Sequence, residues 1–306
     1  MQRTNSAGPL RPGARARGLV GAAMLAFLGC RAEEAPPAPA EALPDTQLPR
    51  VFTLAYPTEW LSRRIAGDDL QVIDGRPDHD DPEAWRPAPE LVFTMKEEAS
   101  VILVGGDFEP WFQEANVSPF ALHRLVDALG PAALERTEGG VLPFPWLEPE
   151  SMEVVARGLA DHFARIHPSR EAGFRARRAE LSKVLAELDR EAREVSVGRL
   201  FGARPAYAYL ARAVGSPFEH LAVDLGRPPS GDETRMWRAR KAAFQASLIL
   251  CSRTPAPEVD RALRANGLVP VVFDLMTHRS AEDRRAGREY PEIFRRNLAA
   301  LRRAAE

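Results

Sequence analysis

A single apolar stripe runs along residues 169–195. Its hydrophobic positions recur at intervals of three, four and seven residues: Phe174, Leu181, Leu185, Leu188 and Val195, with Ala192 in register. This spacing is typical of one narrow face of an α-helix. Pro168 and Ser169 supply a fixed φ and a capping hydroxyl for its first turn. The pattern predicts a helix of about 40 Å that lies as a strut along the outside of two lobes. The alternative is an ordinary helix of a helical domain.

Strand and helix patterns alternate on both sides of this helix. The predicted strands are 51–56, 70–73, 101–104, 196–201, 221–225, 246–251 and 269–273. Helix patterns separate most of them, for example at 89–99 and 256–266. This alternation predicts an α/β protein with two lobes, each built on a parallel-type sheet that helices flank on both faces. We expect the N-terminal lobe at 49–167, the linking helix at 168–195 and the C-terminal lobe at 196–306.

Residues 1–29 have the features of a bacterial lipoprotein signal peptide. Four arginines precede the apolar run 18–28, which is too short to span a bilayer comfortably. Gly29 stands before Cys30 as in a lipobox, so we expect cleavage before Cys30 and lipid on its sulfur. The alternative is a plain secretory signal in which Cys30 is incidental. Residues 30–48 are rich in Pro, Ala and Glu, and this composition predicts a disordered tether.

Composition and charge exclude several classes of function. Without residues 1–29 the chain keeps 37 of its 41 basic residues and all 43 acidic ones, a net charge of −6. That balance argues against a nucleic-acid partner. The chain contains no recognisable nucleophile with its base, no phosphate-binding loop and no Cys-x-x-Cys pair, so it is not expected to be an enzyme. The other cysteine, Cys251, ends an apolar strand pattern and is expected to be a small buried side chain.

A set of short segments connects the chain to a known family. In the first half they are VFTLAYPTEWLSRRIAGDDLQV, DDPEAWRPAPE, ASVILVGGDFEPWF and PWLEPESMEVVARGLADHFARIHPSREAGFRARRAELSKVLAELD. In the second half they are ARPAYAYLARAVG, ASLILCSRTPAPEVDRALRANGLVPVVFD and YPEIFRRNLAAL. In this order and spacing the chain resembles the solute-binding proteins of zinc and manganese ABC transporters.

The resemblance implies a fold, a function and partners. The fold is two α/β lobes bridged by one long helix. The function is that of a periplasm-facing, lipid-anchored solute-binding protein of the bacterial cell envelope, with a role in metal ion uptake. It would be a monomer that delivers its solute to an ABC permease of the inner membrane. The divalent metal, Zn²⁺ or Mn²⁺, is implied in the same way.

The same resemblance identifies the positions that would hold the metal. The family usually uses three histidines and one carboxylate, ligands that suit Zn²⁺ and Mn²⁺. The matching residues here are Glu83 after Asp81-Pro82, Phe144 before Trp146, Arg204 before Ala206, and Asp274 at the end of a strand. Phe144 has no lone pair to offer, and the guanidinium of Arg204 repels a cation. We therefore expect weak metal binding at this position.

The remaining histidines offer a rerouted metal site. His79 lies in an aspartate-rich loop four residues before Glu83, and His278 follows Asp274 by four residues. If a metal is bound, His79, Glu83, Asp274 and His278 are the expected ligands. The alternative for each histidine is that it is a solvated loop residue. Of the others, His162 and His167 are assigned to a helix and its end, and His123 to a surface helix.

An alternative hypothesis assumes the same fold but a different ligand. In it a metal-free cleft binds a small organic anion or a partner protein, with Arg204 as the cationic anchor. The aromatic residues Phe144, Trp146, Trp85 and Tyr207 would form its walls, or else pack the interface between the lobes. A related hypothesis lets Arg204 replace the metal, pairing with Glu83, Asp274 or both, because its planar guanidinium can bond two carboxylates.

The lipid anchor leads to the first prediction. Cys30→Ser removes the only sulfur that the lipobox presents, so the protein should move from the membrane fraction to the soluble fraction of fractionated cells. Cys251→Ser is the matched control and should leave the protein in the membrane fraction. Continued membrane attachment of the Cys30→Ser protein would contradict the assignment.

Overall fold

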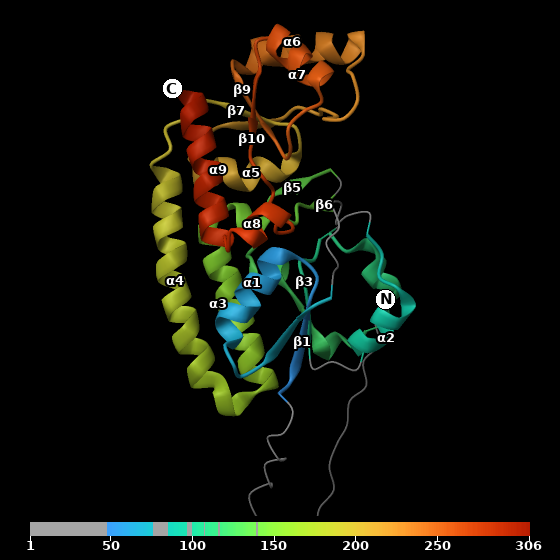
Figure 1. The fold of residues 1–306 in the computed structure, drawn as a ribbon, viewed down its shortest axis with the longest axis vertical. Coiled ribbons are helices and arrows are strands. Elements are labelled where there is room, and N and C mark those ends of the chain that lie inside the picture. The colour runs from blue at the N-terminus through green and yellow to red at the C-terminus, as the bar shows by residue number, and fades with distance from the viewer. Residues whose placement is uncertain (1–47, 76–84, 97–99, 107, 116, 139) are drawn as a thin grey trace, which may run out of the picture. The chain divides into compact units, whose positions relative to one another are not determined.

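The computed structural model describes residues 48–75, 85–96, 100–106, 108–115, 117–138 and 140–306 (Figure 1). Contacts group Thr46–Glu306 into one compact unit, and the fold described below is that of this unit. The predicted signal peptide, Cys30 and the predicted tether up to residue 47 lie outside the described residues. We call the elements that precede helix α4 the first lobe and those that follow it the second lobe.

The first lobe is built on a parallel sheet with the strand order β2-β1-β3-β4. Its strands are β1 (Arg50–Thr53), β2 (Gln71–Asp74), β3 (Ser100–Leu103) and β4 (Leu122–Arg124). Its helices are α1 (Tyr56–Ala66), α2 (Pro89–Lys96) and α3 (Pro149–Ile166), and the antiparallel pair β5 (Arg136–Thr137) and β6 (Gly140–Val141) lies apart from the sheet. Successive side chains of a strand point to opposite faces. Val51 therefore joins the main core and Phe52 a second cluster, so both faces of the sheet are buried.

The second lobe repeats this architecture with the strand order β10-β9-β7-β8, again all parallel. Its strands are β7 (Leu200–Gly202), β8 (Phe218–His220), β9 (Leu248–Cys251) and β10 (Val269–Val272). Its helices are α5 (Ala208–Ala213), α6 (Gly231–Phe244), α7 (Pro257–Ala265), α8 (Ala281–Arg285) and α9 (Tyr290–Ala305). Leu250 faces the main core, whereas Ile249 and Cys251 face a separate cluster. Cys251 is fully buried, as its sequence context predicts, and burial raises the pKa of its thiol to about 12.

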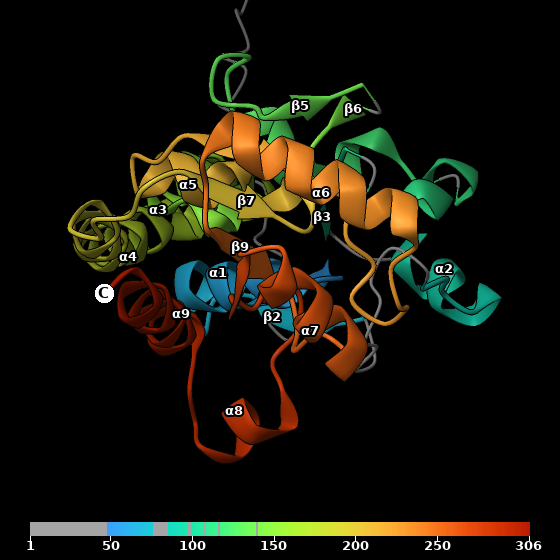
Figure 2. The same cartoon turned by 90° about the horizontal axis from the view of Figure 1, so that it is seen from above.

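Helix α4 (Glu171–Arg193) is the predicted long helix, and it contacts α1 and α3 of the first lobe and α5 and α9 of the second. Figures 1 and 2 both show it beside α3 and α9. Its buried residues are Phe174, Leu181, Leu185, Leu188 and Ala192, which confirms the predicted stripe. The first turn differs from the prediction, because Pro168–Arg170 form a 3-10 turn before the α-helix. Ser169 caps no backbone N–H there, and its hydroxyl lies 3.5 Å from Nδ1 of His167.

Two further assignments from the sequence are corrected. The strand predicted at 221–225 lies at Phe218–His220, where it pairs with β7. The segment after this strand still alternates apolar and polar residues. Its apolar side chains pack in the second-lobe cluster, and they are Leu221, Val223 and Leu225. His123, assigned to a surface helix, lies on strand β4.

A pair of stacked histidines supports the sheet of the first lobe. The rings of His123 and His162 are stacked with their centroids 4.9 Å apart, and Nε2 of His162 is 2.5 Å from the hydroxyl of Ser100. Burial, then the charges of His123 and Arg165, lowers the pKa of His162 to about 3. Burial, then the charge of Arg165, lowers the pKa of His123 to about 4. Both rings are therefore neutral in the folded protein at neutral pH.

These shifts predict a loss of stability in mild acid. Both folded-state pKa values lie below the ordinary value of 6.5, so the unfolded chain binds more protons between about pH 4 and pH 6.5. The free energy of unfolding should therefore fall as the pH drops through this window. His162→Gln keeps a polar partner for Ser100 without a titrating ring. From pH 7 to pH 5 its unfolding free energy in urea should fall by about 2 kcal/mol less than that of the parent. Equal slopes in the two proteins would contradict the assignment.

Candidate functional site

Three of the four positions that the resemblance assigns to metal ligands lie within the described residues. Phe144 precedes the 3-10 turn Pro145–Leu147, Arg204 precedes the turn Pro205–Tyr207, and Asp274 follows β10. Arg204 and Asp274 both follow strands of the second sheet, where the carboxyl ends of parallel strands face the ligand cleft of open α/β sheets. Burial raises the pKa of Tyr207, Cys251 and then Asp274 raise it further, and Arg204 lowers it, so Asp274 and Arg204 both act on this side chain. Glu83 and His79 lie outside the described residues.

Phe144 lies within an aromatic cluster. Its ring centroid is 6.1 Å from that of Phe108 and 5.4 Å from that of Trp146, and those two rings are 5.7 Å apart. The contacts are edge-to-face, an arrangement that aromatic rings favour, and Phe144 is only 4% exposed. This position is therefore part of the apolar core and offers no electron pair to a cation.

The other aromatic candidates also belong to the interior. Trp146 and Tyr207 are fully buried; Nε1 of Trp146 donates to the carbonyl of Leu275 at 2.7 Å, and the hydroxyl of Tyr207 donates to the carbonyl of Phe273 at 2.6 Å. Trp146 precedes α4 and Leu275 follows it, so this hydrogen bond joins the two lobes. Trp85 packs in the cluster on the other face of the first sheet. These side chains pack the cores and the lobe interface, which favours packing over the alternative that they form the walls of a site for an organic anion.

Asp274 has internal partners at both carboxylate oxygens. Oδ1 accepts a hydrogen bond from the backbone N–H of Met276 at 2.8 Å, and Oδ2 lies 3.8 Å from Nη2 of Arg296. Met276 has φ = 55°, a rare value for a residue other than glycine, and this turn aims its N–H back at the carboxylate. Burial raises the pKa of Asp274, whereas the bond from Met276 and the charges of His278 and Arg296 lower it.

Arg204 and His278 are predicted to act together with Asp274. The ion pair of Asp274 is made with Arg296, and the proposed pairing of Arg204 with Glu83 stays a prediction because Glu83 lies outside the described residues. His278 is near enough to lower the pKa of Asp274, and its Nδ1 lies 3.3 Å from the hydroxyl of Thr277. Within the part of the chain that the structure describes, no group of three or more His, Cys, Asp or Glu residues could hold a metal ion. The rerouted set of His79, Glu83, Asp274 and His278 is half outside that part and stays a prediction.

Comparison with known proteins decides the family. The family model of the zinc-uptake complex component A, periplasmic (ZnuA), matches residues 51–304. The chain belongs to the ZnuA family. It is 20% identical over 259 residues to the manganese ABC transporter substrate-binding lipoprotein PsaA of Streptococcus anginosus, a match that covers 78% of this chain and 83% of PsaA.

Solved structures show that the ZnuA-family chain has the fold of known binding proteins. The metal-dependent lipoprotein YcdH of Bacillus subtilis superposes with a TM-score of 0.72 at 18% identity, over 84% of this chain and 98% of YcdH. FpvC of Pseudomonas aeruginosa, solved with Mn²⁺, superposes with a TM-score of 0.69 at 18% identity, over 85% of this chain and 98% of FpvC. Zn(II)-bound AdcA of Streptococcus pneumoniae gives 0.72 at 17% identity over 84% of this chain, which spans 58% of AdcA.

A buried ion pair joins the lobes of this ZnuA-family chain beside the aromatic cluster. Arg212 of α5 donates to both carboxylate oxygens of Glu148, through Nε at 2.5 Å and Nη2 at 2.5 Å. Its Nη1 donates to Glu135 at 2.6 Å, and its guanidinium carbon lies 5.2 Å from the ring centroid of Tyr209. Glu148 is only 4% exposed, and Arg212 supplies the counter-charge beside it. The interaction fixes α5 of the second lobe against the start of α3 in the first.

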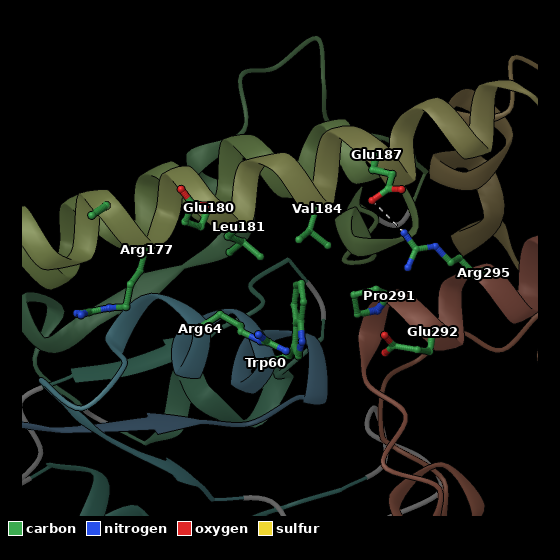
Figure 3. Close-up of a pocket in the computed structure, with 11 residues that line it drawn as sticks. Trp60, Arg64, Arg177, Glu180, Leu181, Val184, Glu187, Pro291, Glu292 and Arg295 are labelled. Carbon is green, nitrogen blue, oxygen red and sulfur yellow. Dashed lines mark ion pairs between the residues drawn. The ribbon is translucent and has the colours of Figure 1, made fainter.

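A groove of about 600 Å³ lies on the side of α4, between α1 and α9. Figure 3 shows Leu181 and Val184 of α4 facing Trp60 of α1 and Pro291 of α9. Its charged rim is paired internally, as in the ion pair between Arg295 and Glu187 at 3.4 Å. The groove has an apolar floor and adjoins elements of both lobes, but its charges are already matched within the chain.

The Gly105-Gly106 pair has a structural role. Both glycines have positive φ, and the carboxylate of Glu109 accepts hydrogen bonds from the backbone N–H of Val104 at 2.9 Å and of Gly105 at 3.0 Å. An internal carboxylate thus occupies the anion-binding concavity that such a turn creates. In the described part of the chain, no helix is both long and apolar enough to cross a membrane.

The interlobe ion pair predicts a large loss of stability. Arg212→Met keeps apolar contact with Tyr209 but leaves the carboxylate of Glu148 buried without its counter-charge. The free energy of unfolding should fall by about 3 kcal/mol, measured by urea denaturation at pH 7. Arg193→Met is the matched control: that arginine pairs with Asp189 and Glu150 at the surface, where its side chain is 55% exposed. The control should cost less than about 1 kcal/mol, and equal costs would contradict a special role for Arg212.

Proposed function

We propose that this chain is the lipid-anchored, periplasm-facing solute-binding component of an ABC transporter of the metal-uptake type. The observation that carries the proposal is the match of the ZnuA family model to residues 51–304, which includes both lobes and the linking helix. The names of PsaA, a manganese transporter lipoprotein, and of the Zn(II)-bound and Mn²⁺-bound structural relatives support a divalent cargo. The partner would be an inner-membrane ABC permease, and the chain would act as a monomer.

The cleft of this protein would hold its ion differently from a site of three imidazoles and one carboxylate. Phe144 lies in the aromatic cluster, and Asp274 is engaged by Met276 and Arg296. Arg204 carries a fixed positive charge at a third position. A free divalent ion at this place would meet one carboxylate that is already bonded, one apolar ring and one cation. We therefore propose weak binding of free metal, with His79, Glu83, Asp274 and His278 as the ligands.

Calorimetry on the full chain in detergent tests the site. Titration with Zn²⁺, Mn²⁺ and Fe²⁺ should give dissociation constants in the micromolar range or weaker, because two family positions cannot coordinate. His79→Ala with His278→Ala should weaken this binding further. Tight one-to-one Zn²⁺ binding that survives both substitutions would show that the site is elsewhere.

Restoring the family ligands gives a gain-of-function test. The triple substitution Glu83→His, Phe144→His and Arg204→His recreates three imidazoles beside Asp274, and Zn²⁺ binding should tighten by at least 100-fold. Adding Asp274→Asn should remove most of the gain. An unchanged affinity in a triple variant with the parent's circular dichroism would contradict the assignment of these positions.

A deletion strain tests the biological role. Loss of this chain should lower the cell-associated zinc, manganese or iron of metal-limited cells, measured by mass spectrometry. The parent sequence should restore the metal content, and the Cys30→Ser variant should restore it less. Unchanged content of all three metals would contradict a role in uptake.

A further inference from the structure

The segment after β10 is held by a network of charges on α8, on α9 and on the turn between them. Asp283 is fully buried, and its carboxylate accepts hydrogen bonds from Nη1 of Arg288 at 2.9 Å and from Nη1 of Arg296 at 2.5 Å. The backbone N–H of Asp283 donates to the hydroxyl of Ser280 at 3.0 Å, which caps α8. Several independent contacts therefore fix the position of Asp283. Through its bond to Arg296, Asp283 in turn fixes the position of that guanidinium.

Arg296 thereby faces two acids. While Nη1 is bonded to Asp283, Nη2 lies 3.8 Å from Oδ2 of Asp274. The neighbouring Asn297 donates from its side chain to the backbone carbonyl of Asp274 at 3.0 Å. Helix α9 thus contacts both the main chain and the carboxylate of Asp274. Asp274 is the position at which this chain keeps a carboxylate where the family has one.

We propose that Arg296 is the internal counter-ion of Asp274 and determines which cations this carboxylate can bind. The inference rests on the proposed function, because it concerns the cleft of that binding protein. The guanidinium supplies a permanent positive charge where a divalent ion would otherwise neutralise Asp274. A metal that bonds Asp274 must either displace this cation or bind within about 4 Å of it.

The expected size of the effect follows from exposure. The side chains of Asp274 and Arg296 are 30% and 41% exposed, so water screens part of the repulsion. The buried bond to Asp283 limits how far the guanidinium can move away. Removing the charge of Arg296 should therefore tighten cation binding at Asp274 by about 10-fold to 100-fold.

A double-mutant cycle tests this coupling. In the Glu83→His, Phe144→His, Arg204→His background, Arg296→Met should tighten the dissociation constant for Zn²⁺ at least 10-fold in calorimetry. The same change with Asp274→Asn present should have no effect. Arg296→Lys keeps the charge and should stay within about threefold of its parent. Arg303→Met, an exposed arginine seven residues further along α9, removes the same charge elsewhere and should also stay within about threefold.

A second readout separates this inference from the assignment of the family positions. Tb³⁺ prefers oxygen ligands, and Trp146 can sensitise its luminescence, because the indole donates to the carbonyl of Leu275, next to Asp274. In the otherwise parental chain, Arg296→Met should raise the Tb³⁺ affinity at least 10-fold, and Asp274→Asn should abolish the gain. Arg296→Gln replaces the Met variant if that protein unfolds. If the triple variant fails to bind Zn²⁺, the assignment of the family ligand positions is contradicted, but the role of Arg296 is not.

Two results would overturn the role of Arg296. One is an equal Tb³⁺ affinity in the parent and in the folded Arg296→Met or Arg296→Gln protein. The other is a gain that persists in the presence of Asp274→Asn, because the released carboxylate would then not be that of Asp274.

Discussion

The structure depends on the burial of one narrow apolar face of α4 against both lobes. Phe174 and Leu181 pack in the same core cluster as Trp60 and Ile65 of the first lobe, and Leu188 in the same cluster as residues of α9. Apolar burial contributes about 25 cal/mol per Å², and because the cluster is continuous, neither lobe has a main core of its own. The helix is therefore part of the core of both sheets, although its outer surface is charged and exposed.

A continuous core also determines where charges can lie. A buried carboxylate is strongly destabilising unless a cation and hydrogen bonds accompany it. Glu148 has Arg212 and Asp283 has Arg288 and Arg296, with both acids nearly or fully buried. Arg212 lies on α5, Arg296 on α9 and Arg288 between α8 and α9, all in the second lobe. The need to neutralise buried acids therefore positions α5 and α9 relative to the residues they contact.

The cleft positions are consequences of the same packing. Phe144 extends the aromatic cluster into a place that the resemblance assigns to a metal ligand, and Nε1 of Trp146 beside it donates to the carbonyl of Leu275 across the lobes. Asp274 keeps its acid but is bonded from its own turn and faced by Arg296. At these positions the protein therefore places its own side chains against one another, on a scaffold that has the fold of metal-binding proteins.

Much of the fold could be predicted from the sequence because the signals are local. The three-four spacing of α4 and the apolar runs of β1, β3, β9 and β10 depend only on which residues lie on one face of an element. Predictions failed where pairing over long range decides the structure. His123 lies on a strand because β4 pairs with β3, and β8 lies at 218–220 because it pairs with β7 rather than where Leu221, Val223 and Leu225 alternate.

For the site, the sequence by itself determined which side chains stand at the positions that the resemblance assigns to ligands, and the side chains of Phe144 and Arg204 have no electron pair for a cation. Only the tertiary structure decided the partner of Asp274. Asp274 lies in the loop after β10, and Arg296 is 22 residues further along the chain, on α9. It is one of several arginines on that helix, and its sequence context does not distinguish it from Arg295 or Arg302. Its charge faces Asp274 because buried Asp283 holds its guanidinium, and burial is a property of the packed chain.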